Sequence, residues 1–176
     1  MFARGLAALL IAATAALIAG DATADEAMVP LAMSGAWVAV AHRPSMIAPA
    51  DTCMVINVDS GIAFRADGDG VQIRIINKSW SLPSGVKGKI NVTVGKSQMW
   101  FDIGDNTDNM VMAEMGDDSA IELFGAMDKA ASMTVSTGKA APINVSLTGS
   151  TKATTAFRTC AGIKSSAAGP GSNPFK

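Results

Sequence analysis

The stretch PINVSLTGSTKATTAFRTC, from Pro142 to Cys160, predicts how the fold closes. Its first part reads as a β-strand, and the Gly149-Ser150 step marks a turn. The small residues that follow predict a helix capped by Ser150 and ending at Cys160. Cys160 is one of two cysteines in the chain, and the other, Cys53, begins a strand-like run. A bond between them would tie the last element of the domain to one of the first.

The N-terminus predicts export. Arg4 precedes the apolar run LAALLIAATAALIAG, and Ala22-Thr23-Ala24 is a small-residue cleavage pattern. The run of about 15 residues is shorter than the roughly 20 that span a bilayer, so we expect no stable membrane insertion after signal cleavage. The predicted organisation is a signal peptide over 1–24, a mobile N-terminal arm over 25–35, a single β-rich domain over 36–163 and a disordered C-terminal tail over 164–176.

Two cysteines in an exported chain most simply form one intramolecular disulfide, here between Cys53 and Cys160. In the chain-entropy model, closing a loop of about 100 residues stabilises the fold by roughly 4 to 5 kcal/mol. The same reasoning predicts a periplasmic or secreted location. The formal net charge is -1, so the charge balance gives no reason to expect nucleic acid as a partner.

Short strand-like runs separated by turns about every eight to twelve residues predict a mainly β fold. We expect an antiparallel β-sandwich-like domain with one or two short helices and one disulfide. The clearest hairpin pattern joins residues 62–66 to 71–77 through Asp-Gly turns. A polar turn is expected over 104–109, and a helix over 120–131. The tryptophans at 37, 80 and 100 are expected to be buried.

The run from Cys53 to Asp59 alternates two sets of side chains. One set is Cys53, Val55 and Asn57, and the other is Met54, Ile56 and Val58. A half-buried strand needs one apolar face, and this run supplies one.

No pattern in the sequence indicates a catalytic residue. The single histidine, His42, has no Gly-x-Ser-x-Gly elbow or reduced cysteine to activate. One His and two disulfide-bonded Cys do not make an ordinary tetrahedral zinc site. We therefore expect no cofactor and no enzymatic activity. A hydrolase with dispersed carboxylates is one alternative, with Asp102, Glu114 and Glu122 available.

A periplasmic protein that binds copper or calcium is another alternative. Thioethers hold copper(I) in an oxidising compartment, and an oxygen-rich turn resembles a loose calcium site without EF-hand spacing. Methionines more commonly fill an irregular core or a contact surface, and acidic turns are commonly solvated. The candidate ligands are Met99, Met110, Met112 and Met115 for copper, and Asp102, Asp105 and Asp108 for calcium.

The Ser-Leu-x-Gly step followed by a small-residue helix resembles the C-terminal segment of the invasion-associated locus B family, exported β-rich proteins of alphaproteobacteria. The matching positions are Ser146, Leu147, Gly149, Ala153 and Ala156, with Trp37 in the family's early strand. In the family a cysteine closely follows that tryptophan, whereas here none occurs before Cys53, and Phe157 to Cys160 replaces an aliphatic helix end. The resemblance implies an envelope or periplasmic β-sandwich-like domain that acts by binding.

Together these patterns predict a non-enzymatic exported binding domain. Its partner would be a protein or a component of the cell envelope, and an inhibitor or accessory factor is a special case of the same function.

Overall fold

The structure is a computed structural model and describes residues 27–164. The predicted signal peptide, the first two residues of the predicted arm and the predicted tail beyond Lys164 lie outside the described residues. The elements in chain order are β1 (Ala27–Ser34), β2 (Trp37–Arg43), β3 (Thr52–Asn57), β4 (Ile62–Asp67), β5 (Gly70–Ile76), β6 (Lys89–Val94), β7 (Ser97–Thr107), β8 (Met110–Met115), α1 (Asp117–Met127), β9 (Ser132–Thr137), β10 (Ile143–Ser146) and α2 (Ser150–Ala161).

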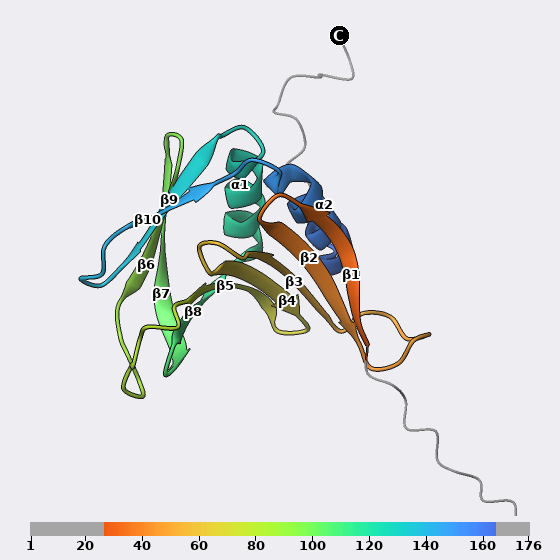
Figure 1. Cartoon of the computed structure of the whole chain (residues 1–176), viewed down its shortest axis with the longest axis horizontal. Coiled ribbons are helices and arrows are strands. Elements are labelled where there is room, and N and C mark those ends of the chain that lie inside the picture. The colour runs from red at the N-terminus through yellow and green to blue at the C-terminus, as the bar shows by residue number, and fades with distance from the viewer. Residues whose placement is uncertain (1–26, 165–176) are drawn as a thin grey trace, which may run out of the picture.

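The strands form one ten-stranded sheet in the order β1-β2-β3-β4-β5-β8-β7-β6-β9-β10, and every pairing is antiparallel over residues 27–164. The predicted mainly β, antiparallel fold class is therefore confirmed. The sheet bends so that strands β1–β5 and strands β6–β10 form two halves, as in a sandwich, although the sheet is continuous (Figure 1). Both helices lie on the same side of the arch made by β2–β5 (Figure 1).

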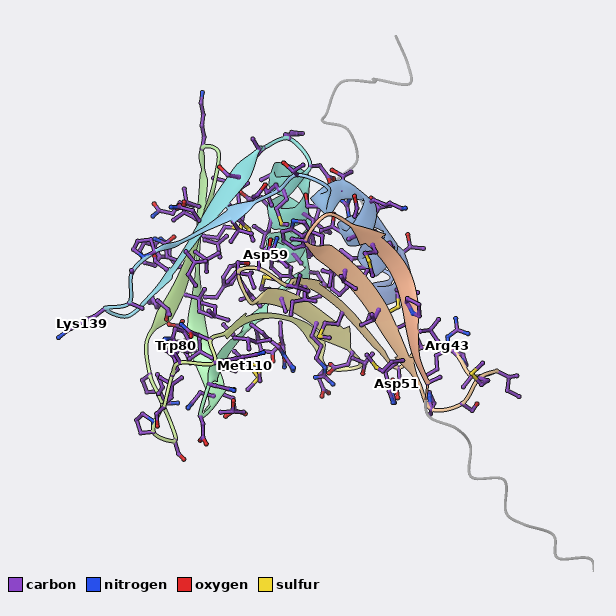
Figure 2. All side chains as sticks on the ribbon, viewed as in Figure 1. Arg43, Asp51, Asp59, Trp80, Met110 and Lys139 are labelled. Atoms are coloured by element: carbon purple, nitrogen blue, oxygen red, sulfur yellow. A yellow bond between two sulfur atoms is a disulfide. The ribbon has the colours of Figure 1, made fainter. Side chains whose placement is uncertain are left out.

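Three phenylalanines join the helices to the sheet. Phe64 of β4 meets Phe124 of α1 edge to face, with ring centroids 5.1 Å apart, and Phe124 lies 5.5 Å from Phe157 of α2. All three rings are fully buried. Each buried side chain of this size stabilises the fold by roughly 1.5 to 3 kcal/mol. Figure 2 shows the side chains that fill the space between the sheet and the helices.

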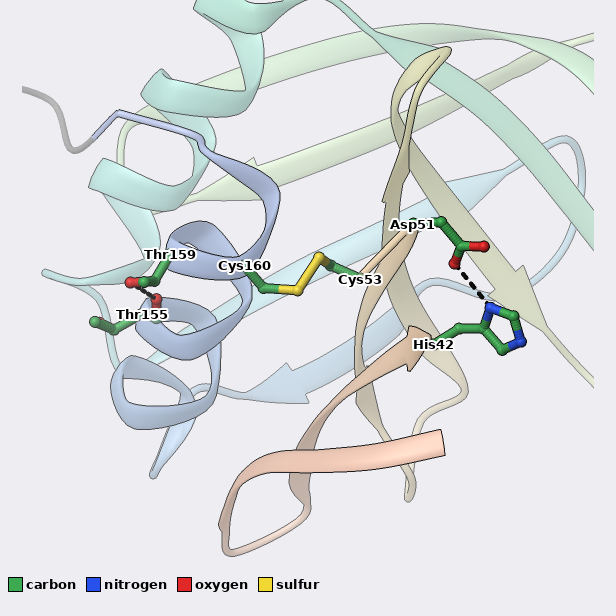
Figure 3. The surroundings of a disulfide bond; sticks show 6 residues. All are labelled: His42, Asp51, Cys53, Thr155, Thr159 and Cys160. Atoms are coloured by element: carbon green, nitrogen blue, oxygen red, sulfur yellow. Dashed lines mark hydrogen bonds and ion pairs between the residues drawn. A yellow bond between two sulfur atoms is a disulfide. The ribbon is translucent and has the colours of Figure 1, made fainter. Parts of the chain in front are cut away.

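The predicted disulfide is confirmed. Cys53 of β3 and Cys160 of α2 are bonded across 107 residues of sequence, with their Cα atoms 6.0 Å apart (Figure 3). The bond fastens α2 to the first half of the sheet, where this helix also packs against β1 and β2.

The end of β10 meets the β1–β2 hairpin, so the two ends of the sheet approach each other. Trp37 Nε1 donates a hydrogen bond of 2.9 Å to the Ser146 backbone oxygen. Beside it, Gly149 has φ +82°, and a Cβ at this position would lie 2.7 Å from the Ser34 backbone oxygen. Gly149 is also the N-cap of α2, without a side-chain cap, so the predicted cap at Ser150 is wrong by one residue. A positive φ and a close backbone approach both require glycine there.

The predicted mobile arm over 25–35 is wrong where the structure describes it, because residues Ala27–Ser34 form strand β1. Two features hide this strand in the sequence. The register shifts between Pro30 and Ala32, which breaks the alternation of side chains. In addition, Pro30 cannot donate a ladder hydrogen bond, but β1 is the edge strand of the sheet, where proline is tolerated.

The polar turn expected over 104–109 is shorter in the structure. Strand β7 continues to Thr107, with a register shift between Ile103 and Asp105, and only Asp108 and Asn109 connect it to β8. The polar residues before this turn belong to a solvated strand, whose sequence looks like that of a loop.

Candidate functional site

The strongest candidate is the outer face, which we define as the side of β1–β5 and β8 turned away from both helices. Antiparallel sheets commonly carry polar residues on the face that does not cover the core. Here cross-strand register places side chains in rows that are apolar on β1–β3 and mostly polar or charged on β4, β5 and β8. The first row is Met33, Val38, Ile56, Ala63, Arg74 and Met112. The second row is Pro30, Val40, Met54, Arg65, Gln72 and Glu114.

Strand β3 shows how the apolar surface arises. The side chains of β3 that face the core are those of Cys53, Val55 and Asn57, so the polar Asn57 is buried. The Asn57 carboxamide oxygen accepts hydrogen bonds of 3.0 Å from both the backbone and the hydroxyl of Ser60, which satisfies it inside the fold. The entirely apolar set of β3 and its continuation therefore faces outward, and Val58 is 58% exposed.

Two methionines of the edge strand extend this surface. Met28 is 59% exposed and Met33 is 66% exposed. Methionine suits a contact surface because its thioether chain is flexible and polarizable and adapts to a partner's shape. Large exposed apolar side chains that adjoin one another mark interaction sites more often than isolated ones do.

A hollow of about 400 Å³ opens on the outer face and is called the arginine hollow below. It is lined by Met28, Val40, His42, Asp51, Thr52, Met54, Arg65 and Arg74. Its apolar wall comes from β1–β3 and its guanidinium groups from β4 and β5. Figure 2 labels Asp51 and Met110, which lie on this side of the molecule, away from both helices.

Most charges around the arginine hollow are paired. His42 Nδ1 lies 2.7 Å from Asp51 Oδ1 (Figure 3). The hydrogen bond from His42 holds the pKa of Asp51 below its ordinary value, against an opposing effect of desolvation. Arg65 forms an ion pair with Asp67 on the same strand.

Arg74 differs from these neighbours. Its Nε and Nη2 both donate to Gln72 Oε1, at 3.0 and 2.6 Å. Burial is the main cause that lowers the pKa of Arg74, and the nearby positive charge of Arg65 acts in the same direction, while the more distant carboxylates of Asp67 and Glu114 oppose it. The site therefore contains a partly desolvated guanidinium whose hydrogen-bond acceptor is neutral.

A second hollow, of about 640 Å³, is called the aliphatic hollow. Ile56, Val58 and Ile76 line it from β3, the turn after β3, and β5, and Ile143 lines it from β10. Lys78 stands at its border. Met54 lines the arginine hollow and Ile56 lines the aliphatic hollow, and both residues belong to the outward side of β3.

The predicted copper ligands do not gather at one place. Met110 and Met112 share the outward side of β8, as their spacing predicts. Met115 is buried on the opposite side of the same strand, and Met99 packs against the core from β7. Met99 and Met115 therefore contribute to the core, and Met110 and Met112 belong to the outward surface of β8. Copper binding stays a prediction that the geometry does not support.

The predicted acidic ligands are engaged by other groups. Asp102 pairs with Lys89 at 2.7 Å, and Asp105 accepts a hydrogen bond from the backbone of Asn106. Asp108 lies in the β7–β8 turn. No group of three or more His, Cys, Asp or Glu side chains is placed to hold a metal ion within residues 27–164.

The acids offered for a hydrolase also lie apart. Glu114 accepts a 2.6 Å hydrogen bond from Gln72 on the outer face. Glu122 belongs to α1 and lines a hollow that neither Asp102 nor Glu114 lines. A glycosidase-type mechanism needs two carboxyl groups that flank one bond, and the structure does not bring these three together.

All three tryptophans were expected to be buried, but Trp80 is only partly buried against the core and Trp100 is exposed. Trp37 is fully buried, whereas Trp100 is 57% exposed on the outward side of β7. Its cross-strand partner is Asn91, and Gln98 and Asp102 flank it on the same strand face. This second half of the sheet is polar outside, so it contrasts with the outer face of the first half.

Compared with protein-family models, curated proteins and solved structures, the chain matches none of them. The resemblance to the invasion-associated locus B family therefore stays a prediction. The helices between Ala27 and Lys164 are too short or too polar to cross a membrane. The surface chemistry of the described residues is therefore the feature that indicates a function.

Proposed function

We propose that this chain is a non-enzymatic binding domain that holds a partner protein on the outer face of its first five strands and β8. The observation that supports the proposal is the apolar character of the β1–β3 part of a sheet face that covers no core. Exposed apolar side chains such as Met28, Met33 and Val58 would be solvated at a cost unless a partner covers them.

The size of the outer face fits a protein surface. Six neighbouring strands, β1 to β5 and β8, span about 24 Å at a spacing of about 4.8 Å. Four rows of outward side chains along a strand cover about 20 Å. The resulting area is on the order of 500 Å² before relief is counted, which corresponds to a small interface beside the roughly 800 Å² that each partner buries in a standard one.

We further propose that the domain acts in the periplasm or outside the cell. The predicted signal peptide and the Cys53–Cys160 bond support this location, because structural disulfides persist in oxidising compartments. A partner that meets the domain there is another exported protein or the protein part of an envelope component. An inhibitor or accessory factor would bind in this way.

Charge substitutions at exposed positions test the proposal. Met33→Glu and Val58→Glu each place a carboxylate on the outer face, and both wild-type side chains are more than half exposed, so the fold tolerates the change. We expect each variant to retain about one tenth or less of the partner that wild-type protein retains on an affinity resin with envelope extract, since apolar anchors dominate interface energies.

Gln98→Glu is the matched control, because it adds the same charge on the polar half of the sheet. It should retain the partner at the wild-type level. Equal retention by all three variants would contradict the proposal. Self-association of the wild-type chain that Met33→Glu abolishes, measured by light scattering, would instead assign the outer face to a second copy and overturn the heterologous partner.

A further inference from the structure

We infer that the arginine hollow receives an acidic side chain of the partner protein, with Arg74 as the group that binds the carboxylate and Met54 and Val40 as the wall for a neighbouring aliphatic side chain. This inference rests on the proposed function and names the chemistry that the partner must present at one point of the outer face.

The nearby carboxylates of the protein itself are already bound to other groups. Asp51 is held by His42 at 2.7 Å, and Asp67 by Arg65. Glu114 accepts the 2.6 Å hydrogen bond from Gln72. Among residues 27–164, Arg74 has no carboxylate within ion-pair distance, whereas its neighbour Arg65 has one. The hollow therefore contains one guanidinium without its usual anionic partner.

The surroundings of Arg74 favour an incoming anion. Its cross-strand neighbours are Ala63 on β4 and Met112 on β8, which supply no acceptor. The bonds from Nε and Nη2 converge on the single oxygen of Gln72, so the other amino group, Nη1, is available for a new acceptor. A guanidinium in partly apolar surroundings binds carboxylate more strongly than one in open water, because the competing hydration is weaker.

The other wall of the hollow indicates that the carboxylate belongs to a polypeptide with an apolar neighbour. Met28, Val40 and Met54 line the side opposite the arginines, within a volume of about 400 Å³. Along β2 and β3 the apolar wall continues into the Met33 row of the outer face. An aliphatic residue next to glutamate or aspartate meets both walls at once.

A pair of capped dipeptides tests the inference without knowledge of the natural partner. The probe is N-acetyl-Leu-Glu-amide, and the control is N-acetyl-Leu-Gln-amide, which lacks only the charge. In the isotope-labelled full chain, the Arg74 Nε–H nuclear magnetic resonance signal should shift on titration with the probe. The glutamine dipeptide should bind about tenfold more weakly, which corresponds to about 1.4 kcal/mol.

Two variants assign the effect to Arg74. Arg74→Gln should abolish the response of the neighbouring amide signals to the probe, and Lys78→Gln, which removes a charge beside the aliphatic hollow, should leave it intact. An equal response to both dipeptides, no response to either, or an unchanged response in Arg74→Gln would overturn the inference. A stronger response to inorganic phosphate than to the probe would also overturn it, since the hollow would then select another anion.

The same experiments distinguish failure of the acidic contact from failure of the proposed function. If Met33→Glu loses the captured partner while Arg74→Gln keeps it and the dipeptides do not bind, the outer face is the binding surface and only the acidic contact is wrong. If Met33→Glu keeps the partner, the proposed function fails whatever the dipeptides do.

Discussion

At the scale of single residues, the structure separates charges that stabilise the fold from a charge that is available to a ligand. His42 and Asp51 join the end of β2 to the start of β3 through a 2.7 Å contact. Arg158 of α2 pairs with Asp128 at the end of α1, with side-chain nitrogen and oxygen 3.0 Å apart. Arg74 has only a neutral acceptor. Residue chemistry alone predicts none of these differences, because each depends on which strands are neighbours.

The lowered pKa of Asp51 predicts a pH dependence of stability. The folded state favours the ionised carboxylate, so this group stabilises the protein above its ordinary pKa of 3.8 and loses that contribution as pH falls through the lower folded value. Asp51→Asn should therefore reduce the free energy of unfolding between pH 5 and 7. The difference from wild type should vanish at more acidic pH.

Urea unfolding at a series of pH values measures this difference. Asp59→Asn serves as the control, since Asp59 has no hydrogen-bond or ion-pair partner within the described residues, and its difference from wild type should stay small throughout. A deficit of Asp51→Asn that persists or grows as the pH is lowered would show that the contact does not act through the ionised carboxylate.

At the scale of elements, regular alternation was predictable and irregular pairing was not. The hairpin of β4 and β5 follows the sequence closely, because its strands alternate and its turn contains Asp-Gly pairs. Strand β1 was missed because its register shift and Pro30 disrupt alternation. For β3, the sequence showed two alternating sets, but the set that faces the core was decided by Ser60, which satisfies Asn57.

The turn between β10 and α2 gives a prediction at this scale. Gly149→Ala should lower the free energy of unfolding by about 2 to 4 kcal/mol, because the new methyl group meets the Ser34 backbone at 2.7 Å in addition to the cost of a positive φ. Gly138→Ala is the matched control, with φ +52° and no atom within 4 Å of the added Cβ. It should cost only about 1 to 2 kcal/mol.

Thermal and urea unfolding of the two variants check this expectation. Equal destabilisation by both substitutions would mean that the close approach of the turn to the β1–β2 hairpin contributes nothing to stability.

At the scale of the whole molecule, the predicted closure of the fold is confirmed, whereas the proposed binding surface emerges only from the structure. The bond between Cys53 and Cys160 was predictable from two cysteines and a predicted export signal. The outer face was not, since it gathers side chains from six strands whose order places β8 next to β5. Its rows appear only after the register is known, and the same register separates the proposed copper ligands.

If a partner protein covers the outer face, methionine oxidation measures this coverage directly. Met28, Met33 and Met46 are 59%, 66% and 67% exposed, but only the first two belong to the outer face, so Met46 is an internal control. With hydrogen peroxide and mass spectrometry, the free chain should oxidise at all three positions. After capture of the partner, Met28 and Met33 should become protected while Met46 reacts as before. Oxidation of Met28 and Met33 at the same rate in the free and the captured chain would contradict the proposed binding surface.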